Sequence, residues 1–190
     1  MSFFDWAAPL FAAFGDRWSR QRIEEIAAYL QPSLPAEGGI VLDLGGGTGV
    51  LSARLAPLLD VRFVVADPAR AMTRYVPDDA RIEVVDAPAQ ALPFPDHHFD
   101  GVIVSDAFHH FGDQESAVRE IARVMKPGAA VVMLEFDARN RLVRWIERLV
   151  DPHGHLFAPG ELCAYLAAHG ITGSCQSKGP FEFDFVGRAS

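Results

Sequence analysis

The residues best suited to chemistry in this chain stand in a glycine-rich turn. An apolar run over residues 40–44 precedes the turn and an amphipathic segment opens near residue 50, which is the order of a buried strand, a tight turn and a helix. Glycine serves where the backbone takes a positive φ or where a ligand lies against bare main chain, and the first amides of a helix lack partners within it. The pattern therefore predicts a ligand-binding turn. Its acid and glycines are Asp43, Gly45, Gly46, Gly47 and Gly49.

Two well-known ligand turns do not match this spacing. A dinucleotide fingerprint that starts at Gly45 requires its third glycine at position 50, where the chain has Val50. A P-loop ends in Gly-Lys followed by Ser or Thr, and this stretch contains no lysine. With a carboxylate two residues ahead of the first glycine, what remains resembles motif I of the class I S-adenosylmethionine-dependent methyltransferases. A plain tight turn is the alternative.

A second acid is predicted to lie beside this turn. The strand expected over residues 62–66 ends in Asp67, 18 residues beyond Gly49, and the second strand of a doubly wound sheet ends next to the first turn. A carboxylate there can accept from both hydroxyls of a ribose, each charge-assisted bond contributing about 1.5–3 kcal/mol. The alternative is a helix cap, because Asp ahead of Pro68 is a good start signal.

A third acid, Asp86, follows the strand expected over residues 81–85. We expect Asp86 to bond the exocyclic amine of an adenine while Ala87 and Leu92 line the ring. On chemistry alone, a solvated acid at a strand end is an equally good interpretation.

Further motifs extend the resemblance along the chain. In order, they are Asp86-Ala87, Leu92-Pro93-Phe94-Pro95-Asp96, Phe99-Asp100, Ser105-Asp106-Ala107-Phe108-His109-His110-Phe111 and the run from Val118 to Gly128. They are similar in order and spacing to the small class I methyltransferases that include the ubiquinone and menaquinone C-methyltransferases, over about residues 40–136. The resemblance implies S-adenosyl-L-methionine as the cofactor. The expected cofactor-binding residues are Asp43, Gly45, Gly46, Gly47, Gly49, Asp67, Pro68, Met72, Asp86, Ala87 and Ser105.

The chemistry implied is methyl transfer. A sulfonium cofactor carries an activated methyl group, so the protein must bind it, align an acceptor for in-line displacement and sometimes remove a proton. The end of the fourth strand would face the methyl group, which makes His109, His110 and Asp106 the expected catalytic residues. Neutral imidazole can take a phenolic or enolic proton near pH 7. The alternative packs one histidine as structure and leaves the other solvated.

The histidines could bind a metal ion instead of acting as catalytic residues. Spacing of the type His-x-His is a weak metal signal and histidines are common in turns, so we predict no metal. The residues that such a site would draw on are His109, His110, Glu135, Asp151, His153 and His155.

Strands and helices alternate along the chain, which implies right-handed crossovers and a mainly parallel sheet. Strands are predicted over residues 40–44, 62–66, 81–85, 101–105 and 129–134, followed by a terminal pair over 171–177 and 181–187. The resemblance implies that this pair is an antiparallel hairpin at one edge. The predicted fold is α/β, a single Rossmann-like doubly wound domain with a seven-stranded, mostly parallel sheet and helices on both faces.

The N-terminal region is predicted to form two helices, over residues 3–14 and 16–30. They either cover an edge of the sheet or form a lid that closes over an apolar substrate. We therefore expect an N-terminal helical cap or lid over residues 1–36 and an S-adenosylmethionine-binding domain over residues 37–190.

The composition of the chain limits the classes of partner that it is expected to bind. The 190 residues carry 17 basic and 25 acidic side chains, a net charge of −8, which works against a broad nucleic-acid or anionic-membrane footprint. No run approaches the roughly 18–20 apolar residues that span a bilayer. Aromatic residues near the predicted crevice favour a small, apolar or aromatic acceptor: Phe94, Phe108, Phe111 and Phe157.

Two cysteines, Cys163 and Cys175, are too few for a disulfide framework, and the N-terminus has no basic segment followed by a cleavable apolar run. We expect a cytoplasmic monomer or homodimer. Three functions remain open: a small-molecule methyltransferase, an inactive S-adenosylmethionine-binding regulatory module, and an enzyme that uses the cofactor for another reaction.

Overall fold

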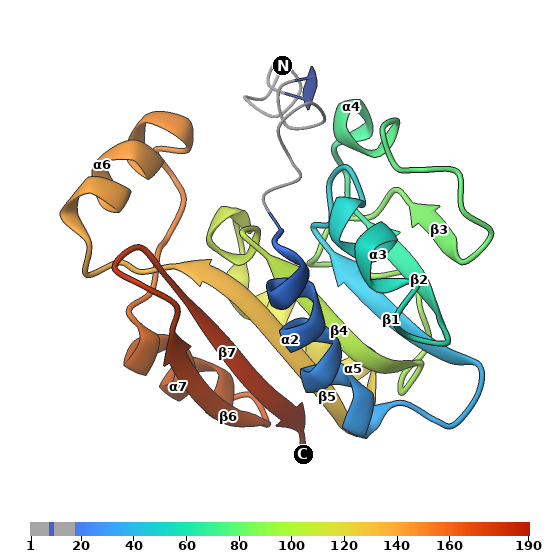
Figure 1. Ribbon diagram of the computed structural model, residues 1–190. Coiled ribbons are helices and arrows are strands. Elements are labelled where there is room, and N and C mark those ends of the chain that lie inside the picture. Colours follow the sequence, from blue (N-terminus) through green and yellow to red (C-terminus); the bar gives the residue numbers. More distant parts are fainter. Residues whose placement is uncertain (1–7, 10–17) are drawn as a thin grey trace.

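The computed structural model describes residues 8–9 and 18–190, and within these residues the chain forms one seven-stranded sheet (Figure 1). The strand order is β3-β2-β1-β4-β5-β7-β6. Neighbouring strands run parallel from β3 to β5, while β7 is antiparallel to both β5 and β6. This confirms the predicted sheet and its C-terminal hairpin. The strands are β1 Gly39–Leu44, β2 Val61–Ala66, β3 Ile82–Val85, β4 Phe99–Ser105, β5 Met125–Phe136, β6 Ile171–Ser177 and β7 Glu182–Ala189.

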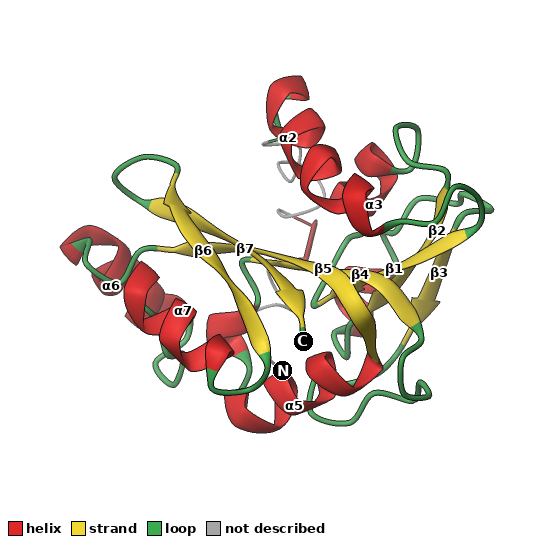
Figure 2. Cartoon of the chain, turned by 90° about the horizontal axis from the view of Figure 1, so that it is seen from below, coloured by secondary structure: helices red, strands yellow, loops and turns green. Residues whose placement is uncertain are grey.

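Helices cover both faces of the sheet, as a doubly wound fold requires. Figure 2 shows α2 and α3 on one face and α5, α6 and α7 on the other. Among the described residues the helices are α2 Arg20–Leu30, α3 Val50–Leu55, α4 Arg70–Thr73, α5 Gln114–Val124, α6 Arg141–Val150 and α7 Pro159–Ala167, with short 3-10 turns η1 Gln31–Ser33 and η2 Phe108–His110. No helix in the described part of the chain is both long and apolar enough to cross a membrane.

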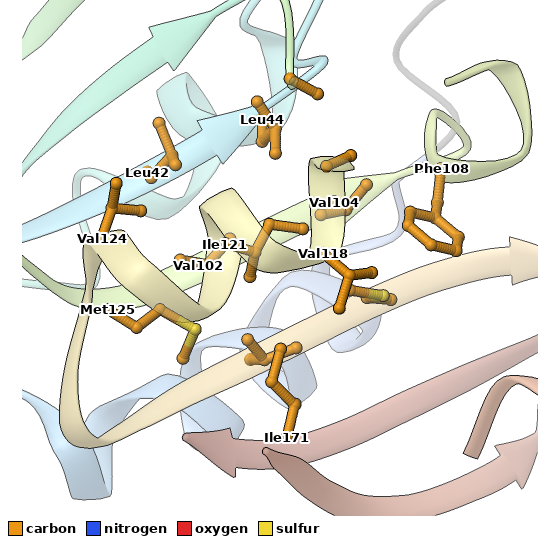
Figure 3. Packing of buried hydrophobic residues seen from close by; sticks show 14 of the residues in the cluster. Leu42, Leu44, Val102, Val104, Phe108, Val118, Ile121, Val124, Met125 and Ile171 are labelled. Carbon is orange, nitrogen blue, oxygen red and sulfur yellow. The ribbon is translucent and has the colours of Figure 1, made fainter. Parts of the chain in front are cut away.

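The alternation of side chains along each strand divides the core into two layers. On the α5 and α7 side, Leu42 and Val102 pack with Val118 and Ile121 (Figure 3). On the α2 and α3 side, the same strands present other residues to Ile26 and Leu30 of α2. All of these side chains are buried, so the sheet is a rigid platform for whatever its strand ends carry.

Helix α2 is attached to the far end of the chain by a buried ion pair. The guanidinium of Arg22 donates to both carboxylate oxygens of Asp184 on β7, and Asp184 is fully buried. Helix α2 also begins at a side-chain cap, since Ser19 accepts from the amide of Arg22 at 3.2 Å. The helix predicted over residues 3–14 lies outside the described residues apart from Ala8 and Pro9.

The amphipathic segment that opens near residue 50 is helical only as far as Leu55, because residues 56–60 turn into β2. Met125 follows the last residue of α5 and opens β5 opposite Phe99 of β4, and this pair is followed by a register shift. One cross-link was not anticipated: Cys163 of α7 and Cys175 of β6 form a disulfide.

Candidate functional site

The glycine turn after β1 has the geometry expected of a ligand-binding loop. Gly45 and Gly47 have φ angles of 70° and 52°, where side chains are strained. A Cβ atom on Gly45 would lie 2.5 Å from that of Ala107, and one on Gly47 would lie 3.1 Å from Cε of Met72. Bare backbone is therefore needed at both glycines, and the side chain of Met72 lies against the turn at Gly47.

Asp43 lies beneath the turn. Its Oδ2 accepts from the hydroxyl of Ser52 on α3 at 2.6 Å, and a Cβ on Gly46 would lie 2.6 Å from its carboxyl carbon. Only 1% of Asp43 is exposed, and Oδ1 has no hydrogen-bond partner among the described residues. Burial raises the pKa of Asp43 to about 6, against the opposing hydrogen bond from Ser52. A buried carboxylate with an unpaired oxygen can accept a hydrogen bond from a positively charged group.

Asp67, at the end of β2, points back into the same turn. Its Oδ2 accepts from the amide of Gly47 at 2.9 Å, and its Oδ1 accepts from the amide of Ala69 at 2.7 Å. Asp67 is not the cap of the next helix, because the N-cap position of α4 is Ala69, with no side-chain cap bond, and the role of Asp67 toward a ribose stays a prediction. Burial raises its pKa, while these two amides work in the other direction. Each oxygen keeps lone pairs for further donors.

The expected adenine contacts lie further along the same edge. Asp86 is exposed just after β3 and pairs in solvent with Nε of Arg70 at 2.5 Å. Ala87 and Leu92 are buried in the core layer under α5. These two side chains therefore face the core, whereas Asp86 is exposed.

The loop after β4 carries the expected catalytic residues. Asp106 has a φ of 47°, an uncommon conformation for a residue other than glycine, and its Oδ2 accepts from the hydroxyl of Ser105 at 3.3 Å. Phe111, which ends this loop, lies 3.4 Å from the position of a Cβ on Gly45. The loop therefore meets the glycine turn at Ala107 and Phe111, and His109 and His110 lie between these two contacts.

The two histidines point toward β5 and α6. Nδ1 of His109 is 2.7 Å from Glu135 at the end of β5, and Nδ1 of His110 is 3.0 Å from Asp151 just after α6. Burial works against charge on His109, but the nearby carboxylates of Glu135 and Glu147 outweigh burial and raise the pKa of His109 to about 9. Burial and the charge of His109 both lower the pKa of His110. The side chain of His109 is buried and that of His110 is 15% exposed, and each ring is paired with a carboxylate.

Glu147 belongs to this histidine cluster but was not among the site residues predicted from the sequence. It is the one acid of helix α6, and its Oε2 lies 3.4 Å from Nε2 of His109 and 4.0 Å from Nε2 of His110. Nothing in the local sequence singles it out, because its meeting with the histidines depends on where α6 lies over η2. A cavity of about 170 Å³ opens beside this group and is also lined by Arg144, Arg148 and His155.

The expected cofactor fits the residues of the glycine turn. S-adenosylmethionine combines a positively charged methionine half with a ribose and an adenine. The buried Oδ1 of Asp43, which lacks a partner among the residues described, suits an ammonium group, and the turn offers bare backbone at Gly45, Gly46 and Gly47. Asp67 lies next along the edge with acceptor capacity for hydroxyls.

Comparison with known proteins gives concordant matches. Residues 42–133 match the family described as the methyltransferase domain. The ubiquinone/menaquinone biosynthesis C-methyltransferase UbiE of Shewanella frigidimarina is 36% identical over 137 residues, covering 67% of this chain and 52% of that protein. The protein of the same name from Enterobacter sp. is 39% identical over 138 residues, covering 67% of this chain and 54% of that protein. The chain thus spans about half the length of these curated relatives.

The fold has solved counterparts as well. The crystal structure of the YcgJ protein from Bacillus subtilis superimposes with a TM-score of 0.72 at 26% identity, covering 84% of this chain and 71% of that chain. A methyltransferase of an antibiotic biosynthesis pathway from Anabaena variabilis has a TM-score of 0.69 at 25% identity, covering 82% of this chain and 63% of that chain.

Proposed function

Because the chain belongs to the class I S-adenosylmethionine-dependent methyltransferases, we propose that it transfers a methyl group to a small, apolar or aromatic acceptor. S-adenosylmethionine supplies a methyl group already activated by its sulfonium. The observation that carries the proposal is the contact between Asp67 and the amide of Gly47, because it joins the ends of β2 and β1 around a turn with no side chains. In this scheme the turn and Asp43 bind the methionine half, Asp67 the ribose and Asp86 the adenine.

The acceptor would lie on the other side of the turn, against the loop after β4. Phe111 borders the glycine turn there and packs edge-on against Phe108, with ring centroids 5.8 Å apart, which favours an apolar or aromatic acceptor. We place the contacts with the acceptor at Asp106, His109 and His110, and a proton released by the acceptor would be taken within this cluster. The N-terminal cap or lid that would exclude water was predicted over residues 1–36, of which residues 1–7 and 10–17 lie outside the described part of the chain.

Label transfer tests this function. The chain is incubated with methyl-labelled S-adenosylmethionine and a panel of phenols, quinols, amines and thiols, and we expect label in at least one acceptor. Tight binding of the cofactor with no transfer to any acceptor would instead favour a binding module without activity.

A blocked pocket supplies the negative control for that experiment. Gly47→Val places a branched side chain against Met72 at a positive φ, so we expect binding and transfer to fall at least tenfold. The matched control is Gly160→Ala, because a Cβ on Gly160 meets nothing within 4 Å. Circular dichroism and thermal melts separate a blocked pocket from an unfolded chain.

A further inference from the structure

Two histidines and a glutamate converge at a point that the cofactor scheme does not use. His109, His110 and Glu147 each offer one donor atom, and these atoms all lie within 4.8 Å of one another. The rings of the two histidines are close, with centroids 4.0 Å apart. The three residues come from η2 and α6, so the fold brings them together from separate elements.

Each imidazole is oriented by a second carboxylate on its other nitrogen. Glu135 lies 2.7 Å from Nδ1 of His109, and Asp151 lies 3.0 Å from Nδ1 of His110. When Nε2 of His109 gives up its proton to a bound cation, the remaining proton on Nδ1 donates to Glu135 and the Nε2 lone pair faces Glu147, 3.4 Å away. Histidines that bind metals are typically held in this way, with the non-ligating N–H given to a carboxylate.

Two of the converging atoms are buried without a hydrogen bond. Nε2 of His109 and Oε2 of Glu147 have no hydrogen-bond partner in the described part of the chain, although they lie only 3.4 Å apart. The His109 side chain is 2% exposed. A buried polar atom left unsatisfied costs about 1–3 kcal/mol, and a bound cation would satisfy both atoms at once.

We propose that Nε2 of His109, Nε2 of His110 and the carboxylate of Glu147 bind a divalent transition-metal ion such as Zn²⁺. Ligand bonds of about 2.0–2.2 Å in a tetrahedral site place neighbouring donor atoms about 3.3–3.5 Å apart. The spacing of 3.4 Å between His109 and Glu147 already meets this, and the 4.0 Å spacing of His110 needs only a small side-chain rotation. Two imidazoles and one carboxylate suit Zn²⁺ or a neighbouring transition metal better than Mg²⁺.

The site has room for a further ligand. Three protein ligands leave one tetrahedral position open, and the adjoining cavity of about 170 Å³ has Arg144 and Arg148 in its walls. Their positive charge favours an anionic oxygen on the metal. The metal site does not depend on methyl transfer, but its use rests on the proposed function: the open position would hold an oxygen of the acceptor and make its proton more acidic.

Metal binding can be measured without any acceptor. The untagged chain is stripped with a chelator, and Zn²⁺ is titrated by calorimetry at pH 7.5, with Co²⁺ absorbance as a report of ligand geometry. We expect one ion per chain, a tetrahedral Co²⁺ spectrum and a rise in melting temperature on adding Zn²⁺. No binding, or Co²⁺ bound without a tetrahedral spectrum, overturns the proposal and identifies the group as an imidazolium held between Glu135 and Glu147.

Variants assign the ligands. Glu147→Gln and His110→Ala should each weaken Zn²⁺ binding at least roughly tenfold, and Asp151→Asn should weaken it roughly 10- to 100-fold through loss of orientation. His153 is an exposed residue in a turn, so His153→Ala is the matched control and should leave the affinity for Zn²⁺ unchanged. If His153→Ala weakens Zn²⁺ binding as much as the ligand variants do, or if Glu147→Gln does not weaken it, the assignment of the ligands is wrong. Binding of S-adenosylhomocysteine by Glu147→Gln should persist, which separates failure of this site from failure of the cofactor site.

Discussion

Asp43 is buried with little to compensate its charge. Its pKa is raised from 3.8 to about 6 by burial, so between these values the folded chain holds a proton that the unfolded chain has released. Stability from this group is fully present below about pH 4 and is lost as the pH rises through about 6. The loss is on the order of 2–3 kcal/mol.

The variant Asp43→Asn tests this. The variant keeps an acceptor for Ser52 but removes the charge. The difference in free energy of unfolding between the variant and the wild type should therefore increase, in favour of the variant, by about 2–3 kcal/mol from pH 4 to pH 7. Urea unfolding at several pH values measures the difference, and parallel profiles for the two proteins would contradict it. At pH 7 the variant should also bind S-adenosylhomocysteine more weakly, because an amide offers no charge to the ammonium group.

Asp67 is the acid on which cofactor recognition should depend most. Asp67→Ala removes an acceptor for two ribose hydroxyls and also frees the amide of Gly47, so we expect binding to weaken roughly tenfold or more. Calorimetry with S-adenosylhomocysteine gives the affinity. The control is Asp60→Ala, an exposed acid next to β2 that should change little. Unchanged affinity in Asp67→Ala would show that this acid does not hold the ribose.

At the scale of elements, helix α5 begins at a side-chain cap, Asp113. Asp113 accepts from the amide of Ser116 at 3.0 Å and from its hydroxyl at 2.6 Å. Asp113→Ala should lower the free energy of unfolding by about 1 kcal/mol, since the first turn loses its cap. Chemical denaturation measures this, with the exposed Asp78→Ala as control. A loss no larger than that of the control would mean that the cap contributes nothing.

The strands were predictable because parallel strands buried on both faces are apolar throughout. Residues 63–66 and 101–104 show this, and the acid or serine that follows each run marks the carboxyl edge of the sheet, where ligands of doubly wound folds typically bind. Contacts between elements were not predictable. The meeting of Glu147 with His109, and of Asp86 with Arg70, depends on the placement of α6 and α4, which local spacing does not encode.

At the scale of the whole molecule, one ion pair joins the first described helix to the last strand. Arg22 and Asp184 are 162 residues apart in sequence, and Asp184 is fully buried. Arg22→Ala should lower the free energy of unfolding by roughly 3 kcal/mol, because it leaves a buried carboxylate with only Lys178, 3.7 Å away, to compensate it.

The matched control is Arg20→Ala on the same helix. Arg20 pairs with Glu24 in solvent, so its loss should cost under about 1 kcal/mol. Adding Asp184→Asn to the Arg22→Ala variant should restore part of the stability. If the two single arginine variants unfold at the same denaturant concentration, the buried pair does not stabilise the fold.

The strand order has a consequence for synthesis. β7 lies between β5 and β6, so β6, although made earlier, has no place in the sheet until residues 182–189 have left the ribosome. Until then the nascent chain exposes the open edge of its longest strand, β5, which is a template for pairing with other chains. Chaperones that shield unpaired strand edges should therefore matter most before residues 182–189 emerge.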